Sequence, residues 1–104
     1  MFENIQELED FAQDSSDEVL FLEPRKTFDR AIIGFASRAG GSLNVVAYDS
    51  DKCIQAMMED NEWDYEEALE FFEFNTRSAW VGEGTPIFVD RVATFTPVDY
   101  DADA

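Results

Sequence analysis

Residues 31–48 read AIIGFASRAGGSLNVVAY, and this stretch decides the expected fold. Two apolar runs rich in β-forming residues, 31–38 and 43–48, flank the sequence AGGS at 39–42. Two such runs around a pair of glycines are typical of a β-hairpin, because glycine adopts the backbone conformations that a tight turn needs. A helix over residues 29–38 is the competing interpretation. The hairpin predicts a small antiparallel sheet.

A helix is expected directly after the hairpin, over residues 49–61. Asp49 or Ser50 supplies a side-chain oxygen that can accept a hydrogen bond from the first helical turn. The apolar stripe of this helix consists of Cys53, Ile54, Met57 and Met58. Because Cys53 lies in that stripe and has only Lys52 as a basic neighbour, we interpret it as a core residue rather than a nucleophile.

A second helix is expected from Asp64, which forms a capping-box-like pattern with Glu67. Its apolar stripe consists of Tyr65, Ala68, Leu69 and Phe72. Phe71 and Phe74 widen this stripe and predict that this is the most buried helix of the chain. Asn75 is interpreted either as the cap that ends the helix or as a residue that lines a pocket.

Shorter patterns predict the remaining elements. They are an acidic helix at 4–14, an edge strand at 19–22, a turn at 82–86, a strand at 87–89 and a frayed acidic tail at 97–104. Together the patterns predict a single α+β domain over residues 1–104. In this fold a small antiparallel sheet, made of the hairpin and one or two short strands, is packed by two to three helices.

The composition excludes several classes of function. The chain has 104 residues, 24 Asp and Glu against 7 Lys and Arg, a net charge of −17 and no histidine. This charge argues against direct binding of nucleic acid or of an anionic membrane surface, because nothing offsets the repulsion between like charges. Histidine-based catalysis and histidine metal sites are excluded, and the one cysteine cannot form an internal disulfide or a zinc site.

Neither a metal nor a cofactor is expected. Asp49 and Asp51 could ligate a hard cation, but the glycine and the further ligands of a calcium loop are missing, and helix capping explains both acids. The N-terminal sequence carries acids where a signal peptide has bases, and no apolar run approaches the ~20 residues of a membrane span. We therefore expect a cytoplasmic protein.

Four segments carry a resemblance to a known family: FDRAIIG at 28–34, VAYDSDKCI at 46–54, YEEALEFFEFN at 65–75 and AWVGEGTP at 79–86. In these motifs the chain resembles a family of small uncharacterised phage and prophage proteins, over about residues 28–89. The resemblance implies a phage gene and a protein of the host cytoplasm. It brings no catalytic residue, because the family has no assigned chemistry. The motif residues are Tyr48, Asp49, Asn75, Trp80, Gly82, Glu83, Thr85 and Pro86.

The acids are concentrated in blocks. Residues 1–23 and 59–73 each hold eight acids and no base, whereas residues 24–58 hold three acids and five bases. Helical spacing puts successive carboxylates of such a block roughly 5–6 Å apart, close to the spacing of phosphates along a nucleic-acid strand. The candidate partner-binding face consists of Glu59, Glu62, Glu66, Glu70, Glu73, Asp99, Asp101 and Asp103.

We therefore expect a non-enzymatic, anti-defence type of protein that binds and inhibits a nucleic-acid-binding host protein by mimicking nucleic-acid charge. The first helix is expected to add to the acidic face. The plain alternative is a solvated acidic surface that serves solubility or a saline habitat.

Two other classes of function stay open. The first is a structural or regulatory interaction module, or a homodimer, that uses an apolar surface of the 28–89 core. The second is a small-ligand or metal-binding protein around residues 75–85. Glu73 and Glu83 would be the candidate acid–base pair of an enzyme, but no spacing in the sequence fixes their distance.

Overall fold

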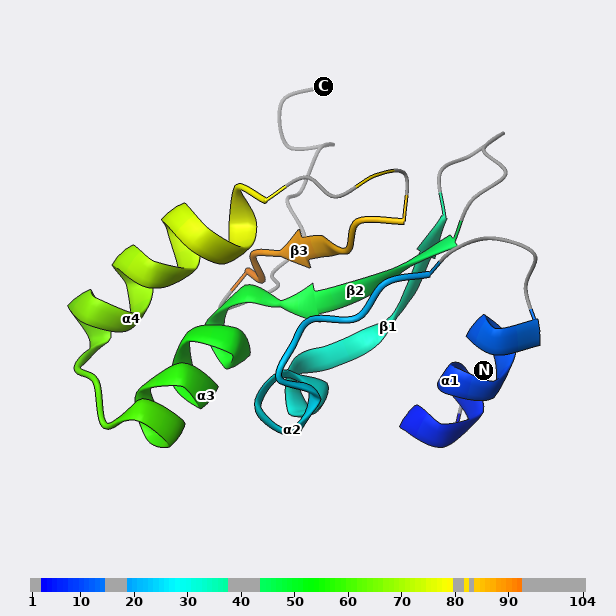
Figure 1. The fold of residues 1–104 in the computed structure, drawn as a ribbon, viewed down its shortest axis with the longest axis horizontal. Coiled ribbons are helices and arrows are strands. Elements are labelled where there is room, and N and C mark those ends of the chain that lie inside the picture. The colour runs from blue at the N-terminus through cyan, green and yellow to red at the C-terminus, as the bar shows by residue number, and fades with distance from the viewer. Residues whose placement is uncertain (1–2, 15–18, 38–43, 80–81, 83, 93–104) are drawn as a thin grey trace, which may run out of the picture.

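The computed structural model describes residues 3–14, 19–37, 44–79, 82 and 84–92. Its elements are α1 (Ile5–Asp14), α2 (Arg25–Phe28), η1 (Asp29–Ala31), β1 (Ile32–Ser37), β2 (Asn44–Asp49), α3 (Ser50–Asn61), α4 (Tyr65–Phe71), η2 (Phe72–Arg77) and β3 (Ile87–Val89). A small three-stranded sheet is packed with helices (Figure 1), so the expected α+β class is confirmed.

The sheet has the strand order β1-β2-β3. β1 and β2 pair antiparallel, as the hairpin interpretation predicts, and the competing helix over 29–38 is wrong because residues 32–37 form β1. A bulge interrupts the register between Ile32 and Gly34, where the glycine has a φ of 150°. The expected turn at 39–42 lies outside the described residues.

β3 corrects the expectation of a wholly antiparallel sheet, because it pairs parallel to β2. Parallel neighbours need a crossover connection, and α3, α4 and η2 lie between these two strands in the chain. The strand at 87–89 itself is confirmed. The turn before it is closed by the Thr85 N–H, which donates to the Gly82 carbonyl at 3.1 Å, and Gly82 has the positive φ, 115°, that the turn needs.

The expected edge strand at 19–22 is wrong. These residues form no strand, and the Leu22 N–H donates to the Tyr48 hydroxyl at 2.8 Å instead of to a neighbouring strand. The backbone of this segment is thus tied to the sheet by a side chain. After Pro24 the chain turns into α2 and η1, two short helical turns that the sequence analysis did not predict.

The two central helices begin where their caps were expected. The Asp49 side chain accepts a hydrogen bond from the Lys52 N–H at 3.1 Å, and the Asp64 side chain accepts one from the Glu67 N–H at 2.9 Å. α3 ends at Asn61, as expected. The second helix does not end at Asn75, because α4 continues into the π-helical turn η2.

The core is built by β2, α3 and the second helix. Its fully buried side chains include Val46, Tyr48, Cys53 and Phe72. Phe72 meets Phe88 of β3 edge-on, with ring centroids 5.2 Å apart. The core thus packs β2 and β3 against the helices that lie between these two strands in the chain.

The expectation that the second helix is the most buried is wrong. Phe71 is 43% exposed and Phe74 is 75% exposed, whereas α3 buries five of its residues. Only Ala68 and Phe72 of the second helix are buried. Phe74 therefore lies on a largely uncovered side of the helix.

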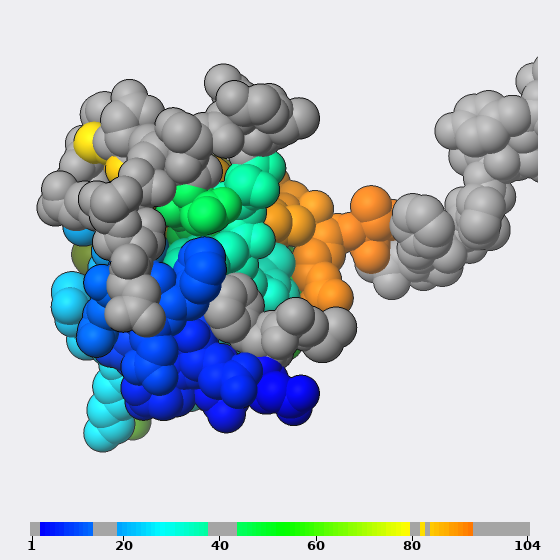
Figure 2. Space-filling model, turned by 90° about the vertical axis from the view of Figure 1, so that its right-hand side faces the viewer, coloured from blue at the N-terminus to red at the C-terminus, as the bar shows by residue number. Residues whose placement is uncertain are grey.

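α1 confirms the expected acidic helix within a residue of its bounds. Leu8 and Ala12 are buried, and α1 lies against β1 (Figure 2). α1 and α4 lie at opposite ends of the molecule (Figure 1). The expected tail at 97–104 lies outside the described residues. In the part of the chain that the structure describes, no helix is long and apolar enough to cross a membrane.

Candidate interaction surface on α4

The candidate acidic face divides into three parts. Glu62, Glu66 and Glu70 are exposed along α4 and the turn before it. Glu59 lies in the last turn of α3, and Glu73 lies in η2. Asp99, Asp101 and Asp103 fall outside the described residues.

Arg30 neutralises the α3 part of this face. Its guanidinium pairs with Glu59 at 3.2 Å and with Asp60 at 2.6 Å. The hydrogen bond from Arg30 lowers the pKa of the Asp60 carboxyl. Glu59 therefore presents less negative charge to a partner than the sequence indicates.

Arg77 neutralises the part of the candidate acidic face that lies in η2. It pairs with Glu73 at 3.2 Å, as the spacing of four residues predicts, and also with Asp90 after β3. The hydrogen bond from Arg77 lowers the pKa of the Asp90 carboxyl. Glu73 is thus held in an ion pair rather than left free on the helix surface.

The other two arginines of the described ranges are also engaged. Arg25 pairs with Asp29 at 2.6 Å and with Glu9 at 3.5 Å, and Arg91 pairs with the buried Asp49 at 3.1 Å. No described arginine is therefore left to neutralise α4.

Four glutamates of α4 and of the turn before it have no ion pair among the described residues: Glu62, Glu66, Glu67 and Glu70. We call these four residues the α4 acidic surface. From the sequence, Glu67 is expected only as part of the cap. Its helical neighbours Glu66 and Glu70 were the available signal that it belongs to the same surface.

A shallow groove of about 410 Å³ adjoins this surface. It is lined by Trp63, Glu67, Glu70, Phe71, Phe74 and Asn75. The rings of Trp63 and Phe71 lie 5.2 Å apart between centroids. We call it the α4 groove. The sequence did not predict this groove, because helical spacing places these phenylalanines beside the apolar stripe that is expected in the core.

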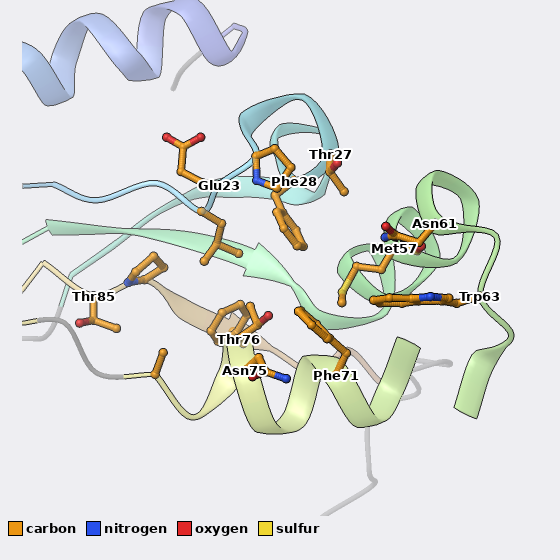
Figure 3. Close-up of a pocket in the computed structure, with 15 residues that line it drawn as sticks. Glu23, Thr27, Phe28, Met57, Asn61, Trp63, Phe71, Asn75, Thr76 and Thr85 are labelled. Atoms are coloured by element: carbon orange, nitrogen blue, oxygen red, sulfur yellow. Dashed lines mark hydrogen bonds between the residues drawn. The ribbon is translucent and has the colours of Figure 1, made fainter. Parts of the chain in front are cut away.

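A second cavity, of about 430 Å³, lies between α2, α3, the second helix and the segment before β3. Phe28 and Phe71 point into it from opposite walls, and Trp63 lies at the end next to α3 (Figure 3). The cavity brings together the motif residues Asn75, Thr85 and Pro86. The motif residues Trp80 and Glu83 lie outside the described residues, so the Glu73–Glu83 pair has no described geometry.

The other three motif residues have structural roles, and that of Gly82 is the turn before β3. Tyr48 is fully buried and its hydroxyl accepts the Leu22 N–H; burial raises the pKa of that hydroxyl to about 12. Asp49 caps α3 and pairs with Arg91. Cys53 is confirmed as a core residue, since it is fully buried and burial raises the pKa of its thiol to about 12.

Among the described residues, no group of three Cys, Asp or Glu side chains is placed to hold a metal ion. The chain matches no family model, no curated protein and no solved structure. The resemblance to small phage proteins therefore rests on the sequence motifs alone, and the functional argument rests on the α4 acidic surface and the two hollows beside it.

Proposed function

We propose that this protein is a phage-type inhibitor that binds a basic, nucleic-acid-binding surface of a host protein through α4. The carboxylates of the α4 acidic surface take the place of nucleic-acid phosphates. The reaction is binding alone, and it needs neither a cofactor nor a metal. The protein would act in the host cytoplasm.

The observation that carries the proposal is that Glu62, Glu66, Glu67 and Glu70 form no ion pair within the part of the chain that the structure describes. Every described arginine is engaged with other acids, so none of these arginines neutralises the four carboxylates. A row of exposed like charges costs stability through self-repulsion, which a basic partner would relieve. Charge complementarity of this kind also speeds association and makes binding sensitive to salt.

The acids of α1 have a smaller role in the proposal. α1 and α4 lie at opposite ends of the molecule, so their acids do not adjoin (Figure 1). Glu9 is paired with Arg25, whereas Glu3, Glu7 and Asp10 are exposed without an ion pair among the described residues. We assign to α1 only a long-range attraction toward a basic partner.

The test is affinity capture from a nuclease-treated bacterial lysate, with elution in a salt gradient. We expect the wild-type protein to retain DNA- or RNA-binding proteins that moderate salt or added duplex DNA releases. The variant Glu62→Lys/Glu66→Lys/Glu70→Lys should lose them. The control Glu3→Lys/Glu7→Lys/Asp10→Lys changes the net charge equally at the other end and should keep them. Unchanged capture by the α4 variant would refute the proposal.

A second candidate function is favoured by the 430 Å³ cavity, whose volume lies in the range of small-molecule sites. Its lining is mostly apolar, and the Asn75 amide at its wall has no hydrogen-bond partner among the described residues. A ligand bound there would raise the melting temperature with its concentration. Melting curves with nucleotides and with divalent cations, recorded at one constant high ionic strength, separate this candidate from charge mimicry, which predicts no saturable shift under that condition.

A further inference from the structure

The α4 groove exposes aromatic side chains to solvent. Covering these side chains would be energetically favourable. Phe74 is 75% exposed and Phe71 is 43% exposed, and Trp63 lies beside Phe71. Burying an exposed phenylalanine side chain is favourable, because it removes apolar surface from water. An exposed aromatic cluster next to a charged surface is typical of an interaction site.

The carboxylates of the groove select the chemistry of its occupant. Glu67 and Glu70 line it without ion pairs among the described residues. An apolar occupant would bury these two charges without partners, which is costly. A second copy of this chain would bring another net charge of −17 and the same carboxylates against them. A cation can form ion pairs with the carboxylates and cation–π contacts with the aromatic rings.

From this combination we infer that the α4 groove binds an arginine side chain of the partner's basic surface. The inference rests on the proposed function and names the contact that would anchor it. A guanidinium is planar, stacks on aromatic rings and donates several hydrogen bonds to carboxylates at once, whereas a lysine ammonium is a compact, strongly hydrated charge.

The chain already contains this kind of contact within itself. The Arg25 guanidinium lies over the Phe21 ring, 4.0 Å from its centroid, while its nitrogen atoms pair with Asp29 and Glu9. The α4 groove offers the same two components, aromatic rings from Trp63 and Phe74 and carboxylates from Glu67 and Glu70, but no arginine of the described ranges lies in it.

The test compares two peptides of equal charge, nona-arginine and nona-lysine, in calorimetric titrations of the full chain. We expect the wild-type protein to bind nona-arginine about tenfold more tightly. Phe74→Ala should remove this preference by weakening nona-arginine binding far more than nona-lysine binding, and Phe74→Tyr should keep the preference. Since Phe74 is largely exposed, both variants should fold, which circular dichroism checks.

The outcomes separate this inference from the proposed function. If Phe74→Ala keeps the arginine preference while Glu62→Lys/Glu66→Lys/Glu70→Lys loses both peptides, the groove inference is wrong and charge-based binding stands. If the triple variant binds both peptides as the wild type does, the proposed function fails. If light scattering shows a wild-type dimer that Phe74→Ala makes monomeric, a second copy fills the groove and the inference is overturned.

Discussion

Asp49 joins three parts of the chain at a single side chain. It lies at the end of β2, caps α3 through the Lys52 N–H, and pairs with Arg91 after β3, with only 2% of its surface exposed. The sequence predicted the cap from local chemistry. It could not predict the contact with Arg91, because that contact is made only when β3 returns beside β2.

Replacing Asp49 should therefore cost more than replacing an ordinary cap. We expect Asp49→Ala to lower the free energy of unfolding by about 1–3 kcal/mol, since it removes the cap and leaves the Arg91 charge without its partner. Asp64→Ala, at an exposed cap without an ion pair, should cost about 1 kcal/mol. Urea unfolding measures both, and equal losses would show that the Arg91 pair adds nothing.

The buried thiol of Cys53 makes stability depend on alkaline pH. Its pKa is raised by burial from an ordinary value of 9.0 to about 12. The folded state disfavours the thiolate. The contribution of the protonated Cys53 thiol to the free energy of unfolding is therefore fully present below about pH 9 and is lost as pH rises toward 12. Urea unfolding between these values should show falling stability. A native thiolate absorbance appearing near pH 9 would contradict this.

At the scale of the element, the second helix shows where prediction from sequence reached its limit. Its start at Asp64, the contact between Glu73 and Arg77, and the burial of Ala68 and Phe72 all follow from local spacing and are found. The exposure of Phe74 could not be predicted, because it depends on which side of the helix other elements cover. The same holds for β3, whose sequence predicts a strand but not its direction.

Phe72 and Phe74 of the second helix allow a direct comparison between a buried and an exposed phenylalanine. We expect Phe72→Ala to lower the free energy of unfolding by about 3–5 kcal/mol, because Phe72 is fully buried against Phe88. Phe74→Ala should change it by less than about 0.5 kcal/mol, because the side chain is largely exposed. Chemical denaturation of both variants checks this. A large loss for Phe74→Ala would show that it packs in the core.

At the scale of the whole molecule, the net charge of −17 is readable from the sequence, but its distribution is not. Arg30 neutralises acids about thirty positions further along the chain, and Arg77 reaches Asp90 across the connection to β3. These pairings depend on the fold, so the free acids could not be separated from the paired ones beforehand. Two groups of these free acids, on α4 and on α1, lie at opposite ends of the molecule (Figure 1).

This unpaired charge should make the protein more stable in salt. Raising the ionic strength from about 0.01 M to about 1 M shortens the Debye length from about 30 Å to 3 Å and screens the repulsion. We expect the melting temperature to rise over this range, and to rise less for Glu62→Lys/Glu66→Lys/Glu70→Lys. A melting temperature that does not change with salt would show that self-repulsion is unimportant in this fold.

A displacement experiment shows whether the α4 acidic surface occupies a nucleic-acid-binding surface of the partner. Labelled duplex DNA or RNA is bound to the partner recovered by affinity capture, and the released nucleic acid is followed by fluorescence anisotropy as the protein is added. We expect the wild-type protein and the α1 charge-reversal control to release the nucleic acid, less efficiently at higher salt, and the α4 charge-reversal variant to leave it bound. A stable complex that holds the partner, the nucleic acid and this protein together would contradict the account.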